Sequence, residues 1–432
     1  MDQIINYILT FLLGVEKASA YASLIGYTSN PNLFHRYRVV IIPSRFFDID
    51  VYGTTESLPK FPLMETEGIP FLYGSPREEM YDDTLIIYAD LIASSYFLMT
   101  RYEEIQKRSV RDAFGRFPGK ESLPYKAGFI NRPIIEEYGK LLRERLRRVN
   151  VPILEPNPGL DKIWLTHDID APFFCRTFRN LLREIVKRQN IFKAIKYYTG
   201  PLENDPYYTF PWMLQENEKV KAICGERCET VFFLKAGGKT PYDKPHYKHW
   251  QKDVKQMLAL MNQHHCLFGL HTSFEASEQP SLISQEKNTL DHVWNLESIT
   301  MNRHHFLSLR EPEDFDKLMK AGITEDFTMG YADVAGFRLG TCRPVRWINP
   351  ITRQLTSLTL HPLTVMDCTL SDAKYMNLRY EEALTYTLLL IKKIREYGGE
   401  VVTLWHNTSF AFNNPCPYHR HLYTLLLKEL TI

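Results

Sequence analysis

Two acidic residues, Asp168 and Asp170, end the apolar run LTHDID and are separated by one residue. Side chains two positions apart in a strand point to the same face, so the two carboxyl groups would lie side by side. Neighbouring carboxylates repel each other unless a cation, a proton or an arginine intervenes. One acid could therefore bind a metal while the other acts as a general base. The alternative is a helix N-cap followed by a surface acid, since Asp is common at both positions.

A second group of polar residues follows the run CLFGLH. His271 ends this run, and Glu275 lies four residues later, within reach of a shared centre if the chain turns helically between them. Neutral imidazole and carboxylate suit zinc and similar divalent ions. His304 and His305 begin the polar run HHFLSLR, and adjacent strand residues face opposite sides, so at most one of them, His305 in our prediction, is a ligand. Each of these histidines could instead be a hydrogen-bonded core residue.

Three more ionisable residues lie in or at the end of short apolar runs. Arg338 stands between glycines in GFRLG, where small neighbours allow a guanidinium to approach a carboxylate. Asp367 ends LTVMD, and His406 follows VVTLW, where an imidazole could serve as a general acid. A His and an Asp at separate strand ends are also half of a serine triad, but the sequence has no G-x-S-x-G motif. It also lacks a G-x-G-x-x-G fingerprint and a P-loop, which argues against nucleotide chemistry.

The elements that must position these residues follow one another in a regular rhythm. Short apolar runs alternate with helical patterns; the runs are KIWLTHDID, TVFFLK, CLFGLH, HHFLSLR, GFR, SLTLHPLTVMD and VVTLWHN. Strand and helix in alternation predict a parallel sheet with crossover helices. Barrel enzymes build their sites from polar residues at the C-terminal ends of such strands. We therefore predict a (β/α) barrel, distorted or incomplete, over residues 162–432.

The residues before this region form a separate pattern. Three prolines and a glycine in VNVPILEPNPGLD predict a linker over residues 151–161, because proline fixes φ and restricts the residue before it. Helical patterns and short extended runs before the linker predict a smaller α/β domain over residues 1–150. Nothing in that domain forms a recognisable catalytic group, and its role stays open.

Composition limits the class of protein. The chain has 432 residues, 44% hydrophobic and 24% charged, as expected for a folded protein of two or three domains. Its net charge is +1, so no overall field favours nucleic acid or anionic lipid. Seven scattered cysteines indicate a reducing compartment rather than a disulfide framework. No signal peptide and no apolar stretch of ~20 residues is recognisable, so we predict a cytoplasmic location and no membrane span.

The order of these motifs resembles that of the polysaccharide deacetylases, carbohydrate esterase family 4. The similarity covers roughly residues 162–410 and consists of Asp-x-Asp, His-[Ser/Thr]-x-x-ligand, Arg, Asp and a late Leu-x-His. The stretch DFTMGYADVAGFRLGTCRP is similar to a branch found in bacterial surface-polysaccharide gene neighbourhoods, in which a domain like residues 1–150 precedes the barrel. The resemblance implies a distorted (β/α) barrel that hydrolyses N- or O-acetyl groups of sugars. It also implies one divalent metal, zinc or alternatively cobalt or nickel.

The resemblance assigns the metal site by position. Asp168 matches the general base, Asp170 the metal-binding acid and His271 the first histidine ligand. Glu275 stands where the usual second histidine would be, and its negative charge would make the metal a weaker Lewis acid. His305 could fill that place instead.

The remaining roles follow in the same way. Arg338 matches the arginine that orients the base, Asp367 the acid that tunes the catalytic histidine, and His406 the general acid. Among the aromatic residues, Tyr207 and Trp405 could present flat faces to a sugar, and core packing is their alternative role.

The resulting hypothesis is a metal-dependent hydrolase that removes acetyl groups from a carbohydrate, a surface-polysaccharide precursor. The expected partner is an acetylated carbohydrate and not nucleic acid, while the oligomeric state stays open. Two alternatives remain: an inert carbohydrate-binding or scaffolding protein that kept the barrel, and a related metal hydrolase of another C–N bond, such as that of a cyclic amide.

Overall fold

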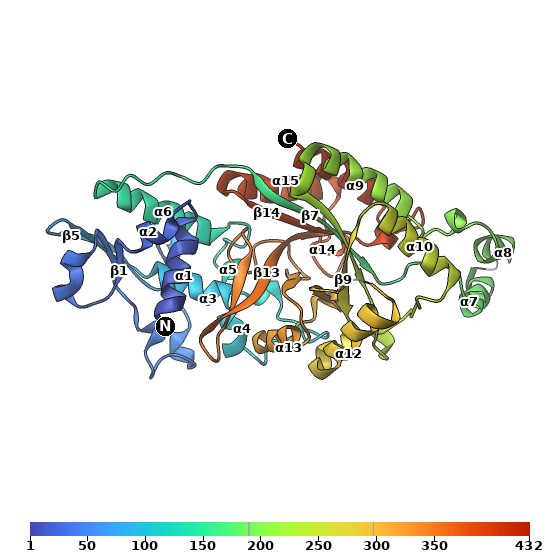
Figure 1. Ribbon diagram of the computed structural model, residues 1–432, viewed down its shortest axis with the longest axis horizontal. Coiled ribbons are helices and arrows are strands. Elements are labelled where there is room, and N and C mark those ends of the chain that lie inside the picture. The colour runs from blue at the N-terminus through green and yellow to red at the C-terminus, as the bar shows by residue number, and fades with distance from the viewer. Residues whose placement is uncertain (189–190, 297) are drawn as a thin grey trace.

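The computed structural model describes residues 1–188, 191–296 and 298–432, and its larger part is a closed β-barrel (Figure 1). Seven parallel strands follow one another in the order β11, β10, β9, β8, β7, β14 and β13, and β13 pairs with β11 to close the ring. Their bounds are β7 Leu160–Ile169, β8 Cys228–Leu234, β9 Leu267–Thr272, β10 Met301–His304, β11 Glu325–Met329, β13 Gln354–Met366 and β14 Gly399–Leu404. The predicted (β/α) barrel agrees with this closed parallel ring in a mixed α/β chain.

The barrel departs from the predicted strand series at two points. The run GFR forms no strand and lies in the connection from β11 to β12, Val345–Asn349, which pairs antiparallel with β13. The run HHFLSLR leaves the sheet after His304, where a short turn over His305–Leu307 begins.

Helices connect the strands of the barrel, and one more follows the last strand. They are α9 Phe210–Cys224, α10 Lys252–Gln263, α11 Phe274–Glu278, α12 Ile283–Asn288, α13 Phe315–Lys320, α14 Asp367–Ser371, α15 Tyr380–Tyr397 and α16 His419–Leu430. Helix α10 shows the local cause, since its buried residues Val254, Met257, Leu258 and Met261 recur at spacings of one, three and four. Helix α15 ends at Gly398, whose φ of 70° lies in the left-handed region that glycine adopts readily.

The first 150 residues build a separate sheet with the order β1-β2-β6-β5. Its strands are β1 Ile25–Tyr27, β2 Val39–Ile41, β5 Gly74–Tyr81 and β6 Thr84–Ala89, and β3 Met64–Thr66 pairs with β4 Ile69–Phe71 beside it. The helices here are α1 Asp2–Leu13, α2 Ala18–Ala22, α3 Leu91–Met99, α4 Tyr102–Gln106, α5 Leu123–Lys126 and α6 Ile134–Arg148. One hydrophobic cluster includes residues from α1 through α16. The division at residues 151–161 stays a prediction, and the last two residues of that range belong to β7.

The connection from β7 to β8 carries a helical hairpin that projects from the body of the molecule. It consists of α7 Phe178–Arg188 and α8 Ile191–Thr199, at the end of the molecule opposite β1 and β5 (Figure 1). Among the described residues, no helix has both the length and the apolar composition needed to cross a bilayer.

Candidate metal and acid–base site

A carboxylate and two imidazoles converge at the C-terminal end of the barrel. Asp170 follows directly after β7, His271 belongs to β9, and His305 begins the turn after β10. One carboxylate oxygen of Asp170 lies 3.2 Å from Nε2 of His271 and 3.2 Å from Nε2 of His305. The three potential ligand atoms lie within 4.8 Å of one another. One Asp and two His are a donor set that suits zinc and related divalent ions.

The second ring nitrogen of each histidine has its own neighbour. Nδ1 of His271 lies 2.9 Å from the carbonyl oxygen of Arg303, to which it donates, so that Nε2 keeps a free lone pair. Nδ1 of His305 faces the buried carboxylate of Asp243 at 3.6 Å. Burial opposes the charge of Asp243, but His305 and the Thr240 hydroxyl outweigh it and lower the pKa of that carboxyl to about 2. Outer partners of this kind orient metal-binding imidazoles, so the residues present fit a divalent metal.

The buried guanidinium of Arg303 holds the second acid of β7. Its Nη1 donates to Oδ1 of Asp168 at 3.0 Å and to the hydroxyl of Thr166 at 2.7 Å, and its Nε donates to the carbonyl of Phe327. The other oxygen of Asp168 lies 3.6 Å from Nε2 of His271. Asp168 is therefore anchored through one oxygen and presents the other to the group of Asp170, His271 and His305. This group of potential metal ligands is called the metal cluster below.

Arg338 does not take part in this arrangement, contrary to the role expected from its motif. Its guanidinium binds Glu104 of α4 through three hydrogen bonds of 2.9–3.1 Å. A Cβ on Gly336 would lie 2.5 Å from the carbonyl oxygen of Ile130. The glycine thus lets the loop approach the N-terminal region, and Arg303 contacts Asp168 in place of Arg338.

An aspartate–histidine pair lies next to Asp170. Asp367 begins α14 directly after β13, and His406 follows β14. Asp367 accepts hydrogen bonds from Nδ1 of His406 at 2.9 Å, from its backbone N–H at 2.8 Å and from the Ser409 hydroxyl. Nε2 of His406 lies 3.6 Å from the second carboxylate oxygen of Asp170. The pair thus points a ring nitrogen at the metal cluster.

The electrostatics of this pair favour acid–base chemistry. Burial disfavours a charged imidazole, but the Asp367 carboxylate outweighs it and holds the pKa of His406 well above its usual value. Cys368 is close enough to form a second potential ligand group with these two residues. Burial raises the pKa of its thiol to about 11, however, and a protonated thiol is a poor metal ligand.

Glu275, one of the predicted ligands, is not part of the metal cluster. It lies in α11, where its backbone N–H donates to Asp243 at 3.3 Å, and its side chain lines an adjoining cavity. His305 occupies the position beside Asp170 and His271 instead. The reason is the turn after β10, where Phe306 and Leu307 have φ values of 60° and 55° and redirect the chain.

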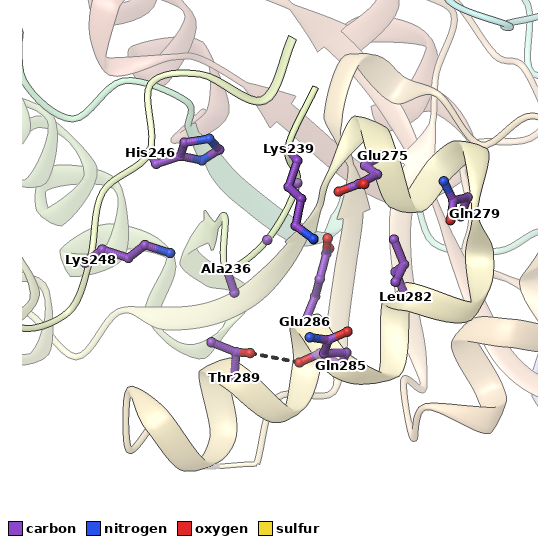
Figure 2. Close-up of a pocket in the computed structure, with 12 residues that line it drawn as sticks. Ala236, Lys239, His246, Lys248, Glu275, Gln279, Leu282, Gln285, Glu286 and Thr289 are labelled. Atoms are coloured by element: carbon purple, nitrogen blue, oxygen red, sulfur yellow. Dashed lines mark hydrogen bonds between the residues drawn. The ribbon is translucent and has the colours of Figure 1, made fainter. Parts of the chain in front are cut away.

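The adjoining cavity has a volume of about 510 Å³, and its lining includes several charged side chains. Lys239, Glu275 and Glu286 converge on it, while His246 and Lys248 lie on its opposite side (Figure 2). Burial raises the pKa of Glu286 to about 7 against the opposing hydrogen bonds from Ser273. The wall of the cavity packs against Asp243, the neighbour of His305, because a Cβ on Gly238 would lie 2.3 Å from the carboxyl carbon of Asp243.

The two predicted sugar-binding aromatics lie in different surroundings. Trp405 is completely buried and packs against Tyr423 with ring centroids 5.2 Å apart, so it has no face to offer a sugar. This prediction is wrong because the residue belongs to the core between β14 and α16. Tyr207 is half-buried, packs edge-on against Phe174 and accepts a hydrogen bond from Asn407 through its carbonyl oxygen. Its contact with substrate stays a prediction.

Sequence reasoning missed Arg303 and Asp243. Arg303 had a signal, because it stands two residues before His305, in the strand β10 that ends at His304. Asp243 had none, since it lies in a loop after β8 and meets His305 only through the fold.

Comparisons with known proteins gave one family match and one similar solved structure. Residues 2–151 match a family of unknown function, DUF7033. No curated protein matches the chain in sequence. A solved structure described as a "putative polysaccharide deacetylase" from Mycobacterium smegmatis is similar with a TM-score of 0.40 and 13% identity, covering 64% of this chain and 88% of that one. Similarity at this level does not establish a shared fold.

Proposed function

We propose that the protein is a metal-dependent hydrolase that removes acetyl groups from a carbohydrate, acting in the cytoplasm on a surface-polysaccharide precursor. One observation supports the reaction type above all: two groups lie 3.6 Å from members of the cluster of Asp170, His271 and His305. They are an anchored carboxylate, Asp168, and a histidine paired with a carboxylate, His406. Hydrolysis of an acyl group needs this combination of an electrophilic centre, a base and an acid. The choice of an acetylated sugar derives from the order of the sequence motifs.

The three clustered side chains would hold one divalent metal, with zinc the first choice and cobalt or nickel the alternatives. Such an ion supplies Lewis acidity, polarising an acyl carbonyl and bringing the pKa of water toward 7. Arg303 keeps Oδ1 of Asp168 engaged, so Oδ2 is the atom that takes a proton from the attacking water. Positioned general bases of this kind contribute roughly 10²–10⁴-fold to the rate.

Completing the reaction requires a proton on the leaving group. The water oxygen forms a bond to the acyl carbon, the bond from that carbon to the sugar nitrogen or oxygen breaks, and Nε2 of His406 donates its proton to the departing amine or alcohol. Asp367 orients the imidazole through Nδ1 and favours its protonated form. The products are acetate and the deacetylated sugar.

The experiment that tests the proposal separates metal binding from catalysis. Metal-repleted protein is offered a panel of N- and O-acetylated sugars beside cyclic amides, and acetate release is measured for the native chain and for Asp168→Asn. We expect native activity, with kcat lowered about 10²–10⁴-fold in the variant and its metal content unchanged, because Asp168 acts as a base and is not a ligand.

Each contrary result points to one alternative. Full activity of Asp168→Asn would refute the mechanism. Hydrolysis of a cyclic amide without acetate release would support a hydrolase of another C–N bond. Metal-free protein that binds sugars and releases no acetate would support the inert carbohydrate-binding protein.

A further inference from the structure

The hairpin of α7 and α8 exposes an unusual amount of apolar surface. Phe178 is 63% exposed, Val186 77% and Phe192 89%, and Leu182, Ile191 and Ile195 are exposed as well. Phe178, Leu182 and Val186 recur every four residues and therefore form one stripe along α7. Contiguous apolar surface of this kind marks a site of interaction.

The hairpin does not need this stripe for its own packing. Leu181 and Ala194 are buried with Cys175 in a small cluster, and Ile185 and Tyr197 pack against it. The two helices thus already have an inner apolar face, and the exposed stripe is a second one. Within the described part of the chain, the side chains of this stripe lie open to solvent.

Basic residues accompany the stripe. The sequence of residues 178–196 contains six basic residues and one acidic residue, whereas the whole chain has a net charge of only +1. Arg183 and Lys196 are exposed and directly follow the exposed apolar residues Leu182 and Ile195 in the sequence. Helices with a strongly apolar face and Lys or Arg around it bind in the interfacial layer of membranes, where anionic headgroups attract the basic side chains.

The position of the hairpin leaves it accessible to a flat surface. It projects from the barrel at the end of the molecule far from β1 and β5 (Figure 1). It also begins eight residues after Asp170, so it belongs to the same connection as this one of the three predicted metal ligands. A surface bound by α7 and α8 would therefore lie on the side of the barrel where the strands end.

We propose that α7 and α8 attach the protein to the surface of a bilayer that contains anionic lipid. The apolar stripe enters the boundary between headgroups and acyl chains, and the basic residues contact anionic headgroups. A second copy of the chain fits less well, because pairing two copies through this face would bring two positively charged hairpins together. The attachment does not depend on the reaction proposed above.

The test measures co-sedimentation of the full chain with phosphatidylglycerol–phosphatidylcholine vesicles and with phosphatidylcholine vesicles. We expect binding to the mixed vesicles to be at least about tenfold stronger and to weaken from about 50 mM to about 500 mM salt. The pair Arg183→Glu/Lys196→Glu should weaken it at least about tenfold. The triple variant Phe178→Ser/Val186→Ser/Phe192→Ser should do the same through lost apolar contact.

Matched controls change similar residues elsewhere. Lys60→Glu/Lys374→Glu alters two exposed lysines, and Ile49→Ser/Ile223→Ser/Ile351→Ser alters three apolar residues that are 55–95% exposed. Neither control should change vesicle binding by more than about twofold, and exposed substitutions of this kind leave stability nearly unchanged. The charge pair gives an independent reading should the apolar triple variant fold poorly.

Two results would overturn the proposal. One is a failure of the native protein to bind mixed vesicles, or equal binding of these vesicles by the native protein and the hairpin variants. The other is sedimentation velocity showing a native dimer that the apolar triple variant converts to a monomer, which would make the stripe a subunit interface.

Discussion

At the scale of single residues, the choice between His305 and Glu275 decides the character of the metal cluster. A second imidazole in place of a carboxylate removes one negative charge from the donor set, which strengthens the metal as a Lewis acid. His305 reaches this position because two consecutive residues after it, Phe306 and Leu307, adopt positive φ. Non-glycine residues rarely do so, and such strained turns occur where a functional geometry requires them.

The metal cluster makes a direct prediction. His305→Ala should reduce metal affinity by more than the roughly 10–100-fold that loss of an outer hydrogen-bond partner costs, because it removes a ligand. Glu275→Gln is the matched control and should bind metal as the native protein does. Titration of apo-protein with zinc, followed by calorimetry, measures both. Loss of metal in Glu275→Gln with retention in His305→Ala would exchange the two assignments.

At the scale of elements, neighbouring strands place a buried ion pair inside the barrel. His361 of β13 lies 2.9 Å from the carboxylate of Glu400 on β14 and 3.5 Å from that of Glu325 on β11. Burial disfavours the charged imidazole, but Glu400 outweighs it and raises the pKa of His361 to about 9. The three strands are therefore linked by charge as well as by their backbone ladder.

This raised pKa predicts how stability depends on pH. The contribution of His361 is fully present below its ordinary pKa of 6.5 and is lost as the pH rises through about 9. Between these values, the free energy of unfolding of the native protein should fall by roughly 3 kcal/mol relative to that of His361→Gln. Urea denaturation across this range measures the difference. His35→Gln, at an exposed site, should show the same dependence of unfolding free energy on pH as the native protein. If His361→Gln also showed the native dependence, the prediction would be contradicted.

At the scale of the whole molecule, charges buried between the N-terminal region and the barrel tie the two together. Glu104 of α4 binds Arg338 from the β11–β12 connection and Arg101, which directly precedes α4 in the N-terminal region. All three side chains are almost fully buried. Burial opposes the charge of Glu104, but the two arginines outweigh it and lower its pKa to about 2. The arginine expected to serve the active site therefore serves this contact.

Removing the shared carboxylate should destabilise the whole chain. Glu104→Gln leaves two buried guanidinium groups without a counter-charge, which costs about 3–5 kcal/mol of unfolding free energy. The exposed pair of Glu121 and Lys126 provides the control, since Glu121→Gln should leave the melting temperature nearly unchanged. The excess stability of the native protein over Glu104→Gln should be full above pH 4.5 and disappear as the pH falls through about 2. Thermal melting of the native protein and both variants at several pH values measures both effects. Equal melting temperatures of Glu104→Gln and Glu121→Gln would refute the role of Glu104.

Most of the barrel strands and the polar residues at their ends could be predicted from local sequence patterns. Apolar runs that alternate with helical patterns predict β7, β8, β9, β13 and β14. At or just beyond the ends of four of these strands stand Asp168, Asp170, His271, Asp367 and His406. These features depend on local periodicity, which a linear sequence records. The same reasoning could assign a parallel barrel because strand and helix alternate along the chain.

Which of these strand ends meet, and which residues complete the site, depends on contacts that only the folded chain makes. Pairing of β13 with β11 closes the ring and brings the ends of β7, β9 and β14 around one centre. Arg303 rather than Arg338 holds Asp168, and Trp405 lies in the core, because these outcomes depend on contacts between segments distant in the chain. Residue type and spacing state what chemistry is available, while ring closure and the packing of the N-terminal region decide where each group can act.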